Sequence, residues 1–525
     1  MKQKIISGIF SVCVAAFLLV GFWQNLPLMK EPLRQLARHQ IEFSEFTAQT
    51  AQTYRDSLAH KLDYINLNGL YSRLVGRRIC NDSLKTKNGL LTSYEPQPFD
   101  ITARCDNMAG FARWLSQRGT DFLYVQAPFK MDVQSEMLPD GLQDYTNRLA
   151  DDMTQMLEKN SLPYLDLREQ LSATPQQVKE NFMITDHHWN VQGAFRGWQL
   201  IMDRLRRDYP QENLPPFYTD LQNWQLHEKK NWSLGSSGRR VGKYYAGTDD
   251  ARWLTPKFDV QLSTAMPYSD ELWQGSFEDA VLSMRHVQSD NCFYNNSYVI
   301  YMGRDYPLVQ HRNPKAPSDM KILIIKDSFA LPVQAFMATV FKQVDVIDPR
   351  SFRQVSMAQY IQATEPDLVM LLYNPRALLE DVFVDFKQDL AAEQNRGEGL
   401  QEVFSQELVE IPAGSEEING IRMVHALQPN TKYTLYIQEA AFTQGEGDVF
   451  SIDIMGIPSM EKQICRIADL KAWPQDGDSW TFYTSDKTDE DMDILVYSGL
   501  RGQSANKTLQ LKNVKLYRHG AAGGE

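Results

Sequence analysis

The chain has 525 residues, too many for one ordinary hydrophobic core, so two or three domains are expected. Its composition is that of a globular protein, with 43% hydrophobic and 23% charged residues. The net charge of −12 argues against a nucleic acid as partner, because neutralising phosphates requires a basic surface.

The chain begins with an apolar segment. Lys2 and Lys4 precede an uncharged stretch from Ile5 to Met29, whose first part is almost wholly apolar. About 18 such residues are enough to cross a bilayer. A cleavable signal peptide has the same basic start, but no small-residue cleavage site follows, so an uncleaved anchor within residues 1–29 is favoured. The lysines would then stay cytoplasmic, and the body would lie outside the cytoplasmic membrane, in the periplasm or at the cell surface.

Residues 30–75 have the pattern of helices, with apolar side chains spaced among charges. They form either a stalk that lifts the body off the membrane or helices packed on the main domain, and the sequence favours neither.

The cysteines bear on the compartment. Cys13 lies in the apolar segment, and the remaining four are an even number in a chain expected outside the cytoplasm: Cys80, Cys105, Cys292 and Cys465. Proximity in sequence makes Cys80 and Cys105 the candidate disulfide. No pair has CxxC spacing, so no metal site is expected from the cysteines.

Residues 76–400 alternate between helical periodicity and short apolar runs. The runs of strand length are 122–125, 164–167, 322–325, 344–347 and 368–372, and the expected helices are 106–117, 145–159 and 190–207. Continuous apolar runs separated by helices predict an α/β domain with a doubly wound parallel sheet and helices on both faces. Residues 210–310 break this rhythm and are expected to be an insertion at the carboxyl edge of the sheet.

Within this domain, Asp186, His187 and His188 follow one another directly, before Trp189 and a helix. An aspartate beside a histidine can fix the imidazole tautomer and stabilise the imidazolium. Either histidine could be the base. Two solvated histidines near a helix start, or a metal site without a supporting Cys or Glu, would fit the segment as well.

Ser328 follows the apolar run 322–325 and precedes a helix expected over 330–341. In a doubly wound sheet, ligands bind at this edge. The hydroxyl of Ser328 would be exposed there, and its N–H, at a helix N-terminus, could stabilise an oxyanion. Taken alone, the segment is more readily explained by Asp327 or Ser328 acting as an N-cap.

Together, Asp186-His187-His188-Trp189 and Lys326-Asp327-Ser328-Phe329 resemble the DHHW protein family. Its relatives are the AlgX- and AlgJ-type polysaccharide O-acetyltransferases, which have SGNH-hydrolase-like domains. The resemblance covers about residues 80–400 and the N-terminal anchor. It implies that Ser328 is the nucleophile, His188 the general base and Asp186 the orienting acid, with no cofactor.

The chain departs from the family at the expected oxyanion hole. Lys326 stands where many relatives have glycine, and the Gly and Asn that complete the hole are sought in Asn295-Asn296 and Gly303-Arg304. Candidates for substrate contacts, most of them just past expected strand ends, are Lys130, Arg304, Arg376 and Asn295. For the charged ones, a solvated loop position is the simpler explanation.

Residues 401–525 change character. Short apolar runs are separated by turn residues such as Gly445, Gly477 and Gly502, with no convincing helix between them, which predicts a β-sandwich of the jelly-roll kind. The resemblance implies a carbohydrate-binding module here. Its aromatic candidates, Trp473, Trp480 and Tyr483, are more often core residues in a small β-domain.

The resemblance implies an extracytoplasmic enzyme that transfers an acetyl group to hydroxyls of a cell-surface or secreted polysaccharide. A membrane-bound O-acyltransferase in the cytoplasmic membrane would be the partner that passes the acetyl group outward. Two alternatives stay open: a glycan acetylesterase with the same three residues, and a non-catalytic glycan-binding or assembly component with a degenerate site.

Overall fold

The computed structural model describes residues 20–21, 23–352, 356–379, 400–414, 419–443, 447–474, 476–485 and 490–519. Most of the apolar segment expected to be an anchor, residues 1–19 and 22, lies outside the described residues. Among the described residues, no helix combines the length and apolarity needed to cross a bilayer.

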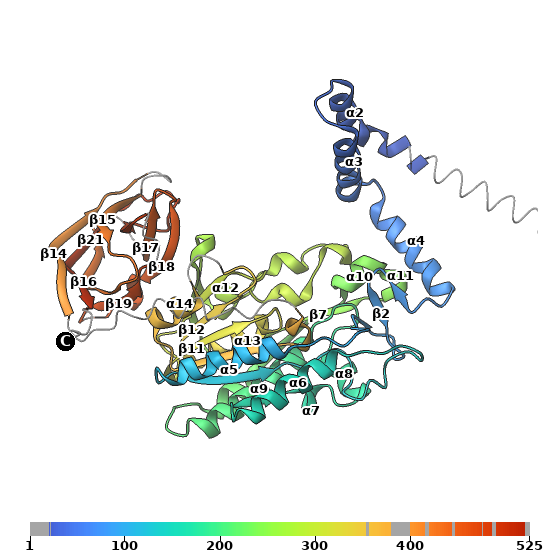
Figure 1. Cartoon of the computed structure of the whole chain (residues 1–525), viewed down its shortest axis with the longest axis horizontal. Helices are drawn as coiled ribbons and strands as arrows, with labels where there is room; N and C mark the ends of the chain where they lie inside the picture. The colour runs from blue at the N-terminus through green and yellow to red at the C-terminus, as the bar shows by residue number, and fades with distance from the viewer. Residues whose placement is uncertain are drawn as a thin grey trace, which may run out of the picture.

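The region expected to be helical, residues 30–75, contains three helices. These are α2 (Lys30–Ala37), α3 (Phe43–Ser57) and α4 (Lys61–Leu74). Helix α4 packs on α10 (Ser236–Val241) and α11 (Lys243–Ala246), and α2 and α3 project from the body beyond it (Figure 1). The Lys243 N–H donates to Asn66 Oδ1 at 2.9 Å, which fixes α4 to the body.

The α/β domain is built on an eight-stranded mixed sheet with the order β5-β4-β13-β11-β12-β10-β8-β9. The first five strands are parallel and the last three join antiparallel. In sheet order, the strands are β5 (Tyr164–Asp166), β4 (Asp121–Gln126), β13 (Leu368–Tyr373), β11 (Ser318–Lys326), β12 (Phe341–Ile347), β10 (Leu308–Arg312), β8 (Gln261–Met266) and β9 (Glu271–Ser276).

The expectation of a wholly parallel sheet is therefore wrong. Strands β8 and β9 come from residues 210–310, so this segment extends the sheet as well as covering its edge. They were missed because they carry no continuous apolar run: every residue of β9 is half-buried, and β8 alternates at its start.

Helices cover both faces of the sheet, as expected. Successive side chains of a strand point to opposite faces, so Leu123 and Ile324 pack with α9 (Val191–Asp208) and α13 (Ala330–Met337). Tyr124 and Ile325 pack on the other face, with α5 (Thr102–Ser116), α6 (Thr146–Lys159) and α14 (Met357–Thr364).

The remaining regular elements of this part are short. They are β1 (Ile79–Cys80), β2 (Ser83–Lys85), β3 (Leu91–Thr92), α7 (Arg168–Leu171), α8 (Pro175–Asn181), α12 (Phe277–Val281) and the 3-10 helices, of which η7 (Ser297–Ile300) and η8 (Pro375–Leu378) bear on the site. Two longer strands, β6 (Trp224–Ser233) and β7 (Asp249–Pro256), form a separate antiparallel pair.

The C-terminal part is strand-rich, as predicted. Two antiparallel four-stranded sheets, β14-β21-β16-β19 and β15-β20-β17-β18, share a buried core (Figure 1). Their strands are β14 (Leu400–Ile411), β15 (Gly420–Leu427), β16 (Lys432–Phe442), β17 (Val449–Ile457), β18 (Glu461–Asp469), β19 (Asp478–Tyr483), β20 (Asp491–Tyr497) and β21 (Leu509–His519).

The aromatic side chains considered for sugar binding lie mostly in this core. Trp480 and Tyr483 are buried, and the ring of Trp480 packs against Phe482 at 5.2 Å between centroids. Trp473 is half-buried and packs against Phe450. These contacts favour a packing role for both tryptophans.

The expected Cys80–Cys105 disulfide is also wrong. All four described cysteines are free thiols. Cys80 belongs to a small apolar cluster beside α10 and α11, whereas Cys105 lies on α5 in the main core. Their proximity in sequence therefore did not bring the two thiols together.

Candidate active site

The segment that carries Asp186, His187 and His188 is a loop between α8 and α9, held from both sides. Asn190 caps α9 by accepting a hydrogen bond from the Gly193 N–H at 2.9 Å. The buried carboxylate of Asp249 accepts hydrogen bonds from the Ile184 N–H and from both the N–H and the hydroxyl of Thr185. The loop is thereby fixed before and after the three residues.

Ser328 lies in the turn between β11 and α13, at the carboxyl edge of the parallel strands, as predicted. The buried Asp327 shapes this turn: its Oδ1 accepts from the Phe329 N–H at 2.8 Å, and its Oδ2 accepts from the backbone and side-chain N–H groups of Asn374 at 2.7 and 2.6 Å. Burial raises the pKa of Asp327 to about 6, although these donors lower it in part.

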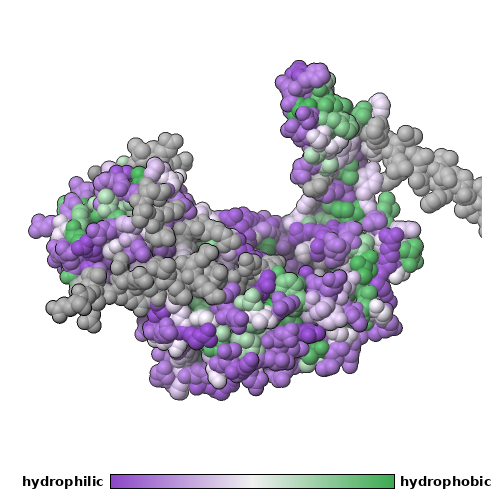
Figure 2. Space-filling view, in the orientation of Figure 1, coloured by the Kyte–Doolittle hydropathy of each residue, from purple (hydrophilic) through white to green (hydrophobic). Residues whose placement is uncertain are grey.

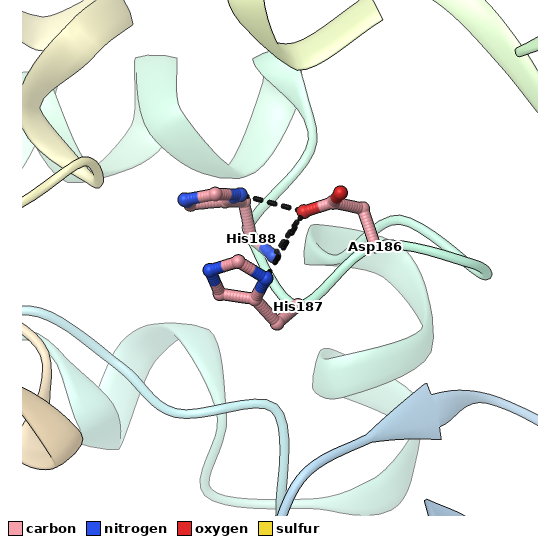
Figure 3. Close-up of side chains that lie close together, drawn as sticks. All are labelled: Asp186, His187 and His188. Atoms are coloured by element: carbon pink, nitrogen blue, oxygen red, sulfur yellow. Dashed lines mark hydrogen bonds and ion pairs between the residues drawn. The ribbon is translucent and has the colours of Figure 1, made fainter. Parts of the chain in front are cut away.

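The turn and the loop bring three side chains into one hydrogen-bonded line. His188 Nε2 lies 2.7 Å from Ser328 Oγ, and His188 Nδ1 lies 2.6 Å from Asp186 Oδ1 (Figure 3 shows the second pair). Asp186 Oδ2 accepts from the Ser236 N–H at 2.7 Å. The acid, the imidazole and the hydroxyl therefore have the connectivity that serine-dependent acyl transfer requires.

The charges suit the same chemistry. Burial alone would raise the pKa of Asp186, but His188, His187 and the donated hydrogen bonds hold it well below its usual value, so the carboxylate stays ionised. Burial and the neighbouring His188 lower the pKa of His187 to about 3, which keeps that ring neutral. No second positive charge then opposes an imidazolium at His188.

The geometry distinguishes the two histidines, which the residues alone did not. His187 Nδ1 is 3.5 Å from Asp186 Oδ1 and 3.1 Å from Ser236 Oγ, and its ring lies beside that of His188, with 3.8 Å between the ring centroids (Figure 3). Only His188 bridges the acid and Ser328.

The same three side chains place ligand atoms within 4.8 Å of one another, so a metal ion is conceivable there. The Oδ1–Nδ1 distance of 2.6 Å suits a shared proton. Two ligands on a tetrahedral ion with bonds near 2 Å would stand about 3.3 Å apart. The arrangement therefore fits a hydrogen-bonded pair better than a metal centre.

Tyr298 was not among the residues expected from the sequence. Its ring lies 3.6 Å from that of His188, at 6° between the planes, and its hydroxyl donates to the Ser328 carbonyl oxygen at 2.7 Å. Trp189 adds a second tie, because its Nε1–H donates to the Phe329 carbonyl oxygen at 3.1 Å. Trp189 belongs to the sequence motif, which pointed to it. Tyr298 lies in the segment expected to be an insertion, and no sequence pattern pointed to it.

Two of the residues considered for substrate contacts have other partners. Lys130 is fully buried, and its Nζ donates to the carbonyl oxygens of Leu91, Ile184 and Asp186 at 2.7, 2.9 and 2.7 Å. An ammonium group has three donors, so none is left for a substrate. The buried Asn295 likewise spends its side-chain N–H groups on the carbonyl oxygens of Trp232 and Ser289.

Arg304 and Arg376 also have partners within the chain. Arg304 is exposed and pairs with Glu271 at 2.8 Å, and Arg376 is half-buried and donates to the Tyr94 carbonyl oxygen at 3.4 Å. Arg376 follows the Asn374 that binds Asp327, so of the four it lies on the segment that contacts the nucleophile turn. A substrate contact by either arginine stays a prediction.

The residues sought for an oxyanion hole serve the fold. Asn296 accepts from the Tyr298 N–H and caps η7, and the Gly303 N–H donates to the Val299 carbonyl oxygen. The ammonium group of Lys326 is buried and ion-paired with Asp305 and Asp348. Its charge is thus balanced by two carboxylates.

A family model described as the SGNH hydrolase-like domain of acetyltransferase AlgX matches residues 89–231, which include Asp186 and His188. No curated protein matches the chain.

Solved structures give distant likenesses. PatB1 of Bacillus cereus is 21% identical, with 57% of this chain and 98% of that chain covered and a TM-score of 0.48. A DHHW family protein of Eubacterium siraeum is 14% identical, with 59% and 96% covered and a TM-score of 0.46. AlgX of Pseudomonas aeruginosa is 12% identical, with 84% and 94% covered and a TM-score of 0.32. The resemblance predicted from the sequence is confirmed, and residues 89–231 are similar to the SGNH hydrolase-like domain of the AlgX acetyltransferases.

Proposed function

We propose that this chain transfers an acetyl group, by way of an ester on Ser328, to hydroxyl groups of a cell-surface or secreted polysaccharide. The observation that carries the proposal is the hydrogen-bonded line from Ser328 Oγ through His188 to Asp186. The matched SGNH hydrolase-like domain supports acetyl transfer as the reaction.

In the first half-reaction, Ser328 Oγ attacks the carbonyl carbon of the acetyl donor and passes its proton to His188 Nε2. The tetrahedral intermediate collapses, the leaving group takes that proton from His188, and the acetyl group stays on Ser328. In the second, a sugar hydroxyl gives its proton to His188 and attacks the ester, and the proton then returns to Ser328 Oγ. The ionised Asp186 stabilises the imidazolium in both halves.

An oxyanion forms in each half-reaction and needs donors. The Ser328 N–H lies just before α13, and within the described part of the chain it donates to no protein acceptor. It is therefore available to the developing negative charge, at the positive end of the helix.

The setting of the reaction is proposed from the sequence. The basic start and apolar stretch of residues 1–29 support an anchor in the cytoplasmic membrane with the body outside. Acetyl donors are made in the cytoplasm, so a membrane-bound O-acyltransferase is the partner that would pass the acetyl group outward. The reaction as written uses no cofactor.

The full chain in detergent would be incubated with a chromogenic acetyl ester, beside Ser328→Ala and His188→Ala variants. The proposal expects turnover that both variants abolish, and acetylated Ser328 in a quenched sample analysed by mass spectrometry. The matched control is Ser236→Ala. It removes the hydroxyl that hydrogen-bonds to His187 and keeps the backbone N–H that donates to Asp186. Turnover that survives in Ser328→Ala would refute the acyl-enzyme.

Adding candidate glycans then separates the acceptors. Acetylated sugar, formed at the expense of free acetate, identifies a transferase. If acetate remains the sole product with every glycan, the same three residues serve an esterase.

A further inference from the structure

Helix α4 turns an apolar face to solvent. Five large hydrophobic side chains recur at helical spacing along it, each between 38% and 76% exposed: Leu67, Leu70, Tyr71, Leu74 and, just past its end, Val75. Such spacing normally marks the face of a helix that is buried against the core. We call these five residues the α4 apolar face.

The buried side of α4 is the more polar one. Asn66, Gly69 and Ser72 are buried, and Asn66 accepts the hydrogen bond from Lys243 in α11. A Cβ at position 69 would meet the Val241 carbonyl oxygen at 2.1 Å, so this close approach requires glycine. The half-buried Leu62 and Ile65 of α4 also pack against the body. The helix is therefore docked by these residues together with its small and polar ones, and the five residues of the α4 apolar face are left for another contact.

The α4 apolar face belongs to a larger apolar region. Of the 22 exposed large hydrophobic side chains among the described residues, 11 lie within residues 20–79, including Trp23 and Phe43 at 75% and 69% exposure. Figure 2 shows hydrophobic surface on the projecting helices and where they meet the body. A concentration of this kind marks a contact surface.

The charge of the same region has the opposite sign to that of the whole chain. Residues 23–79 contain eight Lys and Arg against five Asp and Glu, a net charge of +3, whereas the chain as a whole carries −12. Three exposed arginines lie within or just after the segment of the α4 apolar face, namely Arg73, Arg77 and Arg78, and the Arg77 guanidinium lies over the Tyr71 ring.

We propose that the α4 apolar face lies on an anionic lipid bilayer. Aliphatic and aromatic side chains beside arginines have the composition of surfaces that enter the interfacial region of a membrane. The region also begins directly after the apolar stretch of residues 5–22, which would bring it to the bilayer.

The test uses the purified full chain in vesicles of phosphatidylglycerol and phosphatidylethanolamine. A photoreactive benzoylphenylalanine replaces Leu74, which is 76% exposed, and in a control chain it replaces Leu226, which is 40% exposed on β6 of the body. Irradiation at position 74 is expected to give a chain that carries one phospholipid, and irradiation at position 226 is expected to give at least tenfold less.

Each other outcome overturns the proposal. Cross-linked dimers at position 74 would identify a second copy, and equal lipid adducts at both positions would show that the anchor alone sets the contact. An adduct to another protein in native membranes, without a lipid adduct in vesicles, would identify a protein partner. Because Leu74 is exposed, the unfolding midpoint of the labelled chain should match that of the parent chain.

Discussion

The imidazole of His188 lies face to face with the ring of Tyr298, at 3.6 Å between ring centroids and 6° between ring planes. The Tyr298 hydroxyl also donates to the Ser328 carbonyl oxygen at 2.7 Å, so one side chain contacts both the proposed base and the proposed nucleophile segment. An aromatic face favours a cation above it, and an imidazolium forms there in each half-reaction. Tyr298 is therefore expected to position His188 and to stabilise its charged form.

Replacing Tyr298 separates these two contributions. Tyr298→Phe keeps the ring and loses one hydrogen bond, for which we expect about a fivefold fall in kcat/KM. Tyr298→Leu also loses the aromatic face, and a further fall of about tenfold is expected. The aromatic face acts on the imidazolium that forms during the reaction, so the further loss in Tyr298→Leu should fall on kcat, and KM should stay near its parental value.

If both variants lose activity equally, the aromatic face contributes nothing and Tyr298 is a packing residue only. The measurement is the steady-state kcat and KM of chromogenic ester hydrolysis for the three proteins. Their unfolding midpoints, recorded in the same buffer, control for a loss of folded protein.

The roles of the two histidines make a second prediction. His188→Ala should lower kcat by about four orders of magnitude, because the proton of Ser328 then has no acceptor. His187→Ala should retain most of the activity. The Nδ1 of His187 lies 3.1 Å from Ser236 Oγ, and the ring stays neutral, so it takes up no proton during the reaction. Steady-state rates on one ester compare the two, and a larger loss in His187→Ala would reverse the assignment.

The sequence predicted the residues of this site better than their surroundings. Asp186, His188 and Ser328 were singled out through the family motif, in which the acid lies two residues before the base and a tryptophan follows, and the serine comes after an apolar strand. Tyr298 could not be found, since its segment has no periodicity and its position depends on contacts of η7 with β7 and with Met284–Val287, which local patterns do not reveal.

The other sequence predictions that the structure did not support concern polar residues that turned out to be buried. Lys130 and Asn295 were predicted as candidates for substrate contacts, but each fills its hydrogen-bonding capacity inside the fold. Asp327 was explained as an N-cap. Its Oδ1 does bind a backbone N–H of the turn, and its Oδ2 also binds Asn374, about 50 residues away, which local patterns cannot reveal.

Asn374 supplies a third prediction, on the nucleophile turn. Asn374→Ala removes the side-chain donor at 2.6 Å from Asp327 Oδ2 and leaves the backbone donor of the same residue in place. Losing a hydrogen bond to a buried carboxylate should lower the free energy of unfolding by about 2 kcal/mol. Because the turn carries Ser328, the rate of its modification by a sulfonyl fluoride should also fall.

A turn that is held by other contacts would give the opposite result. Asn374→Ala would then react with the sulfonyl fluoride at the parental rate, whatever its stability. Asn213→Ala is a suitable control, because its side chain donates to the Pro317 carbonyl oxygen at an exposed site away from the turn.

Lys130 supplies the fourth prediction. Its buried ammonium group donates three hydrogen bonds to carbonyl oxygens, two of them in the loop that carries Asp186. Lys130→Met leaves these three acceptors without their donor and should lower the free energy of unfolding by about 3 kcal/mol or more at neutral pH. Lys87→Met is the matched control. Its ammonium pairs with Asp140 at the surface, so a change within about 0.5 kcal/mol is expected.

The stability difference between the parent chain and Lys130→Met should also depend on pH. Burial lowers the pKa of Lys130 to about 8, below its ordinary value of 10.5. Between these values the unfolded chain binds a proton that the folded chain has released, so the contribution of Lys130 to the free energy of unfolding rises with pH. The penalty of Lys130→Met should therefore grow by on the order of 3 kcal/mol from pH 8 to pH 10.5. Denaturant unfolding at pH 7.5, 9 and 10 would measure it. A penalty that stays constant or shrinks over this range would mean that the buried amine keeps its proton.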